Sequence, residues 1–204
     1  MKRIAAIACL ALSSIVYAGL FTPRWSIKLQ PVAADTAGNL HIVDKRPPEQ
    51  TKFHTVDFAK LSYKSYLGDI NTTPDRMAIL AAKLNKAAAS RPNATTVEVT
   101  RFEILQDRSG SACRGCATAA VSYTAAVGAD SGHKPGDDTY MCSISAAIDG
   151  NAQSAEIETS YHSGPFDTNN SAASVTALQA CVDGAIDQWV EKALPNSTDD
   201  HLKP

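Results

Sequence analysis

Apolar and polar residues alternate in four segments of this chain, and that period is typical of a β-strand with one buried and one exposed face. The four segments, in chain order, are residues 95–106, 119–127, 140–148 and 155–161. In the first, the alternation changes phase near Thr100-Arg101, which predicts a β-bulge. Between the last two, Asp149-Gly150-Asn151 predicts a tight hairpin turn. This pattern favours an antiparallel sheet, to which residues 40–43 add another short strand.

Two segments with helical spacing flank these strands. The first opens at Thr73, which can cap a helix, and continues with Pro74 and Asp75, which both suit a first turn. Its apolar stripe comprises Met77, Leu80, Ala81, Leu84 and Ala88. The second covers residues 172–194, is capped by Ser171, and has a stripe of Val175, Leu178, Val182, Ala185, Trp189 and Val190.

Each helix therefore has one apolar stripe, and the sheet has one apolar face. Burial of all three surfaces requires the helices to cover that face of the sheet. The sequence predicts an α+β fold, in which an antiparallel sheet of about four to five strands has two helices packed on one face.

The N-terminus has the pattern of a secretion signal. Lys2 and Arg3 precede residues 4–21, which contain no charged residue, and Val16-Tyr17-Ala18 offers small residues where signal peptidase cleaves. We expect cleavage after Ala18, which removes residues 1–18. Two alternatives stay open: residues 4–21 are retained as an anchor, or Cys9 is lipidated after a very short hydrophobic region.

The rest of the chain divides into a linker at 19–37, a single α+β domain at 38–194 and a flexible tail at 195–204. Cleavage removes two of the 19 basic residues and none of the 21 acidic ones, so the net charge falls from −2 to −4. Beyond Lys45-Arg46 there is no basic cluster, whereas nucleic-acid phosphates need several cations on one face. We therefore expect no nucleic acid as a partner, while the N-terminus favours proximity to a membrane.

Four cysteines remain once Cys9 is removed with the signal, and an even number in an exported domain predicts disulfides. Cys142 lies on the apolar face of its strand, and Cys181 lies on or beside the apolar stripe of the last helix. A strand face and a helix stripe that pack together can bring two cysteines within bonding range. We expect a Cys142–Cys181 bond in the core and a Cys113–Cys116 bond within a loop.

Two alternatives to a structural Cys113–Cys116 bond remain. A thiol-disulfide redox site is one, but such a motif normally opens a helix that lowers the thiol pKa, and here it leads into a predicted strand. A metal site that adds His133 or Cys142 is the other, although the sequence lacks a second closely spaced ligand pair. Ala117 excludes haem attachment, because that motif requires histidine at this position.

The catalytic motifs of common enzyme classes do not occur. The chain has no G-x-S-x-G, no Gly-rich phosphate loop and no H-E-x-x-H. Its histidines occur singly, at positions 41, 54, 133, 162 and 201. We therefore name no catalytic residue, no metal ligand and no cofactor.

Short motifs in the first half of the domain resemble those of small, poorly characterised bacterial cell-envelope lipoproteins of mixed α/β fold. The residues concerned are Val43-Asp44-Lys45-Arg46-Pro47, Gly68-Asp69 followed by Pro74 and the first helix, and the strand at 97–105. The resemblance covers roughly residues 38–106 and implies a periplasm-facing domain near a membrane, with an assembly or auxiliary role. Together with the export signal, it predicts a non-enzymatic periplasmic protein that binds another envelope protein or an envelope ligand.

Overall fold

The computed structural model describes residues 25–32, 40–56, 63–88, 95–112, 137–163 and 169–194. In this part of the chain the elements are β1 (Ile27–Lys28), β2 (Leu40–Asp44), η1 (Pro48–Thr51), β3 (His54–Thr55), β4 (Lys64–Tyr66), η3 (Asp69–Asn71), β5 (Thr72–Thr73), α2 (Arg76–Ala88), β6 (Thr95–Asp107), α3 (Ser109–Ala112), β7 (Asp137–Ile148), β8 (Asn151–His162) and α5 (Ala172–Ala193). The predicted strand at 119–127 lies outside the described residues.

The main sheet has six strands, five of them in the order β3-β4-β6-β7-β8. The sixth, β2, pairs in parallel with residues 95–99 of β6, while β4 pairs antiparallel with residues 105–107 of the same strand. All the other pairings within this sheet are antiparallel. β6 is therefore the strand that joins the two halves of the sheet, and β8 forms one edge.

Both local features predicted within the sheet are confirmed. The register between β6 and β7 shifts between Val99 and Arg101, where the bulge was expected. β7 and β8 are joined by Asp149 and Gly150, whose positive φ angles of 48° and 86° are those that a two-residue hairpin turn requires. Gly150 suits this turn because it has no side chain to strain the left-handed backbone.

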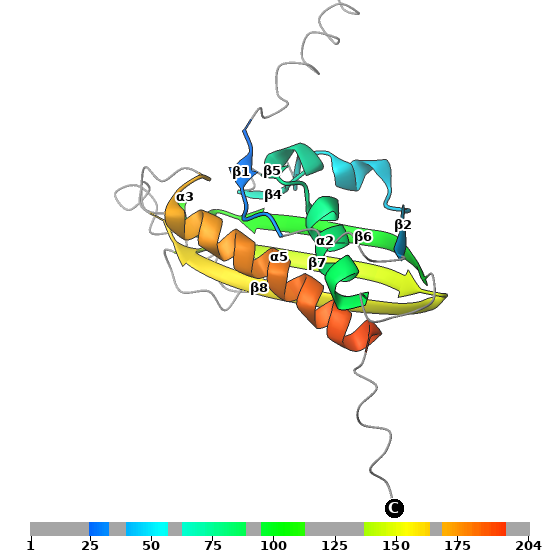
Figure 1. Cartoon of the computed structure of the whole chain (residues 1–204). Coiled ribbons are helices and arrows are strands. Elements are labelled where there is room, and N and C mark those ends of the chain that lie inside the picture. The colour runs from blue at the N-terminus through cyan, green and yellow to red at the C-terminus, as the bar shows by residue number, and fades with distance from the viewer. Residues whose placement is uncertain are drawn as a thin grey trace, which may run out of the picture.

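The helices α2 and α5 pack on the same face of the sheet, with α5 running along β7 and β8 (Figure 1). Ser171 caps α5 as predicted, since its hydroxyl accepts a hydrogen bond from the backbone N–H of Ser174. Lys83 of α2 forms ion pairs of 2.8 Å with both Asp183 and Asp187 of α5. The α+β class, with a mostly antiparallel sheet covered by helices, is therefore confirmed.

The start of α2 differs from the prediction. Thr73 belongs to β5 and pairs in parallel with Lys28, so its backbone is extended and it does not cap the helix. The cap is Asp75, whose carboxylate accepts a hydrogen bond of 2.9 Å from the N–H of Ala78. The prediction was wrong because the short β1–β5 pairing is non-local and leaves no periodic signal in the sequence.

Residues 25–32 were assigned to a linker, and for this segment the prediction was wrong. Ile27 is completely buried and Leu29 is nearly so, and both contribute to the hydrophobic core. Leu29 donates its backbone N–H to the carbonyl of Thr73, and Gln30 donates its own to the side chain of Gln179 on α5. The domain therefore begins by residue 25 and not at residue 38.

Candidate functional site

The core contains the predicted cysteine pair. Cys142 of β7 and Cys181 of α5 are joined at disulfide distance, with their Cα atoms 5.7 Å apart, and both side chains are fully buried. This bond fastens the C-terminal helix to the middle of the sheet. The other predicted pair, Cys113 and Cys116, lies outside the described residues, as do Cys9 and His133.

A buried polar cluster lies between the sheet and the first turns of α5. The hydroxyls of Tyr140 and Ser174 share a hydrogen bond of 2.7 Å, and Gln106 donates to the Tyr140 hydroxyl at 2.9 Å. The rings of Tyr140 and Tyr161 are stacked with their centroids 5.3 Å apart. Burial raises the pKa of Tyr140 well above its usual range. Because the cluster is neutral, enclosed and internally hydrogen-bonded, we assign it a structural role.

The same end of the sheet carries a partly buried ion pair. Asp107 of β6 lies 3.1 Å from Lys64 of β4 and accepts a hydrogen bond from the N–H of Ser109. Burial opposes the charged form of Asp107, but the hydrogen bonds of Ser109 and the charge of Lys64 outweigh it and lower the pKa. On β2, hydrogen bonds from Arg46 likewise hold the pKa of Asp44 below its usual range.

We expect these two carboxylates to make stability depend on pH in the acidic range. A carboxyl group whose pKa is lowered by folding stabilises the native state above its unfolded pKa of about 3.9, and that contribution is lost as the pH falls through the folded pKa. Urea unfolding should therefore give a constant free energy above about pH 5 and a falling one below about pH 4. The free energy of unfolding of the Asp107→Asn variant should fall less steeply with decreasing pH than that of the parent. An equal slope would show that Asp107 contributes nothing.

Two buried arginines form a charged network beside α2. The guanidinium of Arg46 binds Asp44 and Asp69, each through two of its nitrogens, at 2.8–3.0 Å. Arg76 donates to Asp69 at 2.8 Å, to the carbonyl of Leu67 at 3.1 Å and to the carbonyl of Gln50. Both arginine side chains are only 1% exposed. The network joins β2, η1, η3 and α2, so residues 44–46 and 69–76, which belong to two of the motifs named above, meet in space.

This network is internally neutral, with two positive and two negative side chains. Burial opposes the charged form of Arg46, but the hydrogen bonds that it donates to Asp44 and Asp69 outweigh burial and raise its pKa. Burial lowers the pKa of Arg76, which has a single carboxylate partner. The guanidinium nitrogens are directed at protein oxygens, and the network therefore fits a structural function better than anion binding.

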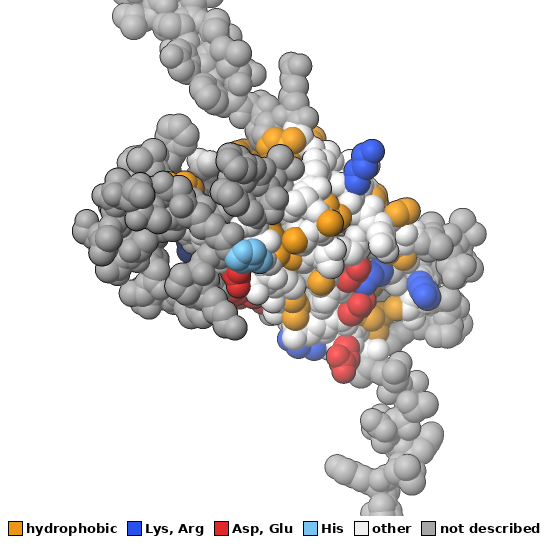
Figure 2. Space-filling view, turned by 90° about the vertical axis from the view of Figure 1, so that its left-hand side faces the viewer, with side chains coloured by type: hydrophobic (Ala, Val, Ile, Leu, Met, Phe, Trp, Pro, Cys, Tyr) orange, Lys and Arg blue, Asp and Glu red, His pale blue; other side chains and the backbone are white. Residues whose placement is uncertain are grey.

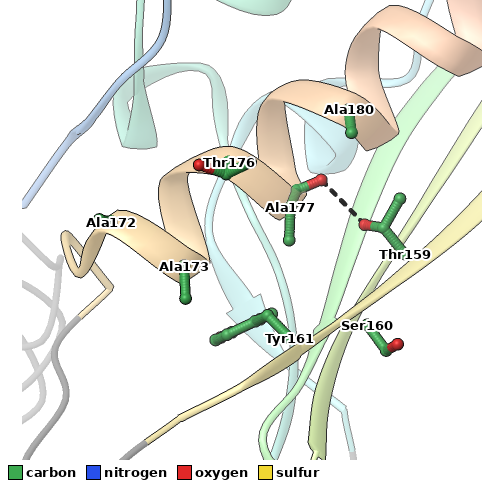
Figure 3. A pocket seen from close by; sticks show the side chains of 8 residues that line it. All are labelled: Thr159, Ser160, Tyr161, Ala172, Ala173, Thr176, Ala177 and Ala180. Atoms are coloured by element: carbon green, nitrogen blue, oxygen red, sulfur yellow. Dashed lines mark hydrogen bonds between the residues drawn. The ribbon is translucent and has the colours of Figure 1, made fainter.

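A shallow groove lies between β8 and the N-terminal half of α5 (Figure 3). It has a volume of about 620 Å³ and is lined by Thr159, Ser160, Tyr161, Ala172, Ala173, Thr176, Ala177 and Ala180. Thr159 donates a hydrogen bond of 2.9 Å to the carbonyl of Ala177, which fixes β8 against the helix at the bottom of the groove. The lining offers the hydroxyls of Thr, Ser and Tyr and small apolar surfaces, but no carboxylate, imidazole, amine or thiol, so it suits binding better than catalysis.

The two halves of β8 differ in whether side chains of α5 cover the outer edge of the backbone. Near its start, α5 covers the outer edge: Gln188 accepts a hydrogen bond from the N–H of Glu156, and Lys192 donates to the carbonyl of Ser154. Alternate residues of a strand direct their backbone groups to the same side, so Ser160 faces outward as Glu156 does. In the described part of the chain no strand pairs with this side of β8, and the helix residues opposite Ser160 are small.

The charged side chains of the described residues form no surface of one sign on the face shown in Figure 2, where acidic and basic residues are interspersed. Within the described residues, no three His, Cys, Asp or Glu side chains are grouped so that they could hold a metal ion. No helix in those same ranges combines the length and the apolar character that a membrane crossing needs.

Sequence reasoning did not identify the groove as a site. The apolar stripe of α5 was identified from its large apolar side chains. The groove is formed instead by the alanines at 172, 173 and 180 on the neighbouring surface of the helix. Comparisons with protein-family models, with curated proteins and with solved structures found no match.

Proposed function

We propose that this protein is an exported, non-enzymatic component of the bacterial cell envelope that binds an extended segment of another envelope protein along β8. The observation that carries the proposal is the outer edge of β8 at Ser160, beside the groove. An incoming strand can hydrogen-bond to such an edge, and its side chains can enter an adjoining groove.

The difference in coverage between the two halves of β8 supports a role in strand binding. Edge strands invite unwanted pairing, and proteins usually cover or block them. Here the first half of β8 is covered by the side chains of Gln188 and Lys192, as the edge of a stable domain requires. The second half adjoins small residues that leave room for a peptide backbone.

The proposed compartment is supported by the core cysteine pair and by the N-terminal sequence. Cysteines joined in a disulfide persist in oxidising compartments such as the periplasm and are rare in the cytosol. Lys2 and Arg3 followed by the uncharged residues 4–21 provide an independent argument for export. An assembly or auxiliary role fits a protein whose groove is lined by hydroxyl groups and small apolar side chains.

Site-specific photo-crosslinking in an exporting bacterial host tests the binding proposal. A photoreactive residue that replaces Ser160 should form an adduct with an extended segment of one envelope protein, whereas the same residue in place of Ser154 should not. Both positions are exposed on the same strand, and they differ in that Lys192 reaches the backbone of Ser154. Mass spectrometry of the adducts identifies the partner and the crosslinked segment.

A groove-filling variant provides the control. Thr176→Trp places a large ring in the groove and should abolish the adduct at position 160, whereas Ala87→Trp on the exposed surface of α2 should leave it intact. Equal adduct yields at positions 160 and 154, or an adduct unaffected by Thr176→Trp, would contradict binding along β8.

A further inference from the structure

A second surface lies where the chain enters the domain. The rings of Trp25 and Phe53 meet edge to face with their centroids 6.0 Å apart. Ile70 of η3 is 59% exposed and, with Tyr63, is one of the two large hydrophobic residues exposed in the described ranges. We define the entry face as Trp25, Phe53 and Ile70.

Three contacts fix the entry face, one of them made by the side-chain amide of Asn71. β1 and β5 pair in parallel from Ile27 and Thr72, which lie two residues after Trp25 and Ile70 in the sequence. Asn71 donates a hydrogen bond of 3.1 Å to the carbonyl of Trp25. Gly68 packs so closely on residues 51–53 that a Cβ atom there would lie 2.6 Å from the backbone nitrogen of Phe53. The three apolar side chains are therefore held at one end of the domain.

An uncharged, largely apolar segment precedes Trp25 in the sequence. Only Thr22, Pro23 and Arg24 separate Trp25 from the uncharged residues 4–21 in the sequence. Leu20 and Phe21 remain attached to the domain whether the chain is cleaved after Ala18 or retains the whole segment.

We propose that the entry face rests on the surface of a lipid bilayer. Tryptophan is favoured at the level of the lipid headgroups, because its ring is largely apolar and its N–H is polar. Lys28 and Lys52 are exposed and close in sequence to Trp25 and Phe53, and their charges would attract anionic headgroups. The nearby Asp69 is bound by both Arg46 and Arg76, so its charge is compensated within the domain.

This surface is separate from the β8 groove. It depends on the export part of the proposed function and not on strand binding, so the two can fail independently. Docking through the entry face would hold the domain at the membrane in a fixed orientation, with β8 available to proteins of the same compartment.

Tryptophan quenching by brominated lipids tests the orientation. The chain has two tryptophans, and the second, Trp189, is completely buried and donates its ring N–H to the carbonyl of Gln153. In a Trp25→Phe background, Ile70→Trp and Tyr63→Trp introduce reporters at the two exposed hydrophobic positions. The full-length gene is expressed in an exporting bacterium, and the processed protein is reconstituted with phosphatidylcholine–phosphatidylglycerol vesicles that carry brominated acyl chains.

The expected result is severalfold stronger quenching at position 70 than at position 63, with Trp189 unaffected in the Trp25→Phe parent. Restoring Trp25 should restore quenching in the otherwise unchanged protein. Equal quenching at positions 70 and 63 would overturn the proposal, since a domain held only by its N-terminal chain shows no preferred face. An absence of quenching at both positions would overturn it as well. Neither result affects the crosslinking pattern of Ser160 and Ser154.

Discussion

Replacement of Asp69 by asparagine should lower the free energy of unfolding by about 3 kcal/mol, because it leaves Arg76 buried without its carboxylate partner. Asp69 accepts hydrogen bonds from Arg46 at 3.0 Å and from Arg76 at 2.8 Å. Arg46 keeps Asp44 in the variant, whereas Arg76 keeps only backbone carbonyls. The Asp69 side chain is 27% exposed, so solvent screening places the effect at the lower end of the range for buried pairs.

A matched surface pair provides the control for this prediction. Lys45 and Glu98 form an ion pair of 2.6 Å, but their side chains are 49% and 42% exposed. Glu98→Gln should therefore change the free energy of unfolding by less than about 1 kcal/mol. Urea unfolding at neutral pH measures both variants. If Asp69→Asn costs no more than Glu98→Gln, the network does not hold β2, η3 and α2 together.

Loss of the core disulfide should have an effect of similar size. Cys142 and Cys181 are 39 positions apart in the sequence, and closing a loop of that length stabilises a fold by about 4 kcal/mol in the chain-entropy description. The double variant Cys142→Ala, Cys181→Ala should lose this stability, and urea unfolding measures the loss. The folded domain should resist mild reductants, since both sulfurs are fully buried.

Reductant provides the control for the disulfide. The parent protein, unfolded and refolded in excess dithiothreitol, should unfold at the same lowered urea concentration as the double variant treated in the same way. The double variant should lose less stability than the parent on addition of dithiothreitol, because only the expected Cys113–Cys116 bond remains to be reduced. A parent protein whose stability is independent of reductant would contradict a bond between these two cysteines.

Local patterns in the sequence predicted much of this fold. Alternation placed strands at 95–106, 140–148 and 155–161, and the structure has β6, β7 and β8 there, although β7 and β8 begin a few residues earlier. The bulge and the hairpin turn were also predictable, because each depends on adjacent residues. The cysteine pair was predictable because strand and helix periods show which side chains face each other.

Non-local pairings were not predictable in the same way. β1 and β5 have two residues each, too few for a period, so Ile27 was assigned to a linker and Thr73 to a helix cap. Arg76 was missed because charged residues are expected at the surface, and only the position of Asp69 in space explains its burial. The two arginines and two aspartates in the resemblance motifs were the available signal for the network. The exposed alanines of α5 were the signal for the groove.

Hydrogen exchange of the backbone amides in β8 measures whether a peptide strand binds to this edge of the sheet. The segment identified by crosslinking at position 160 is synthesised as a peptide and added to the unmodified protein. Exchange should slow at the outward-facing amide of Ser160 and remain unchanged at Glu156, whose N–H is already bonded to Gln188. Protection confined to any other surface, with β8 unchanged, would contradict the assignment of β8 as the binding edge.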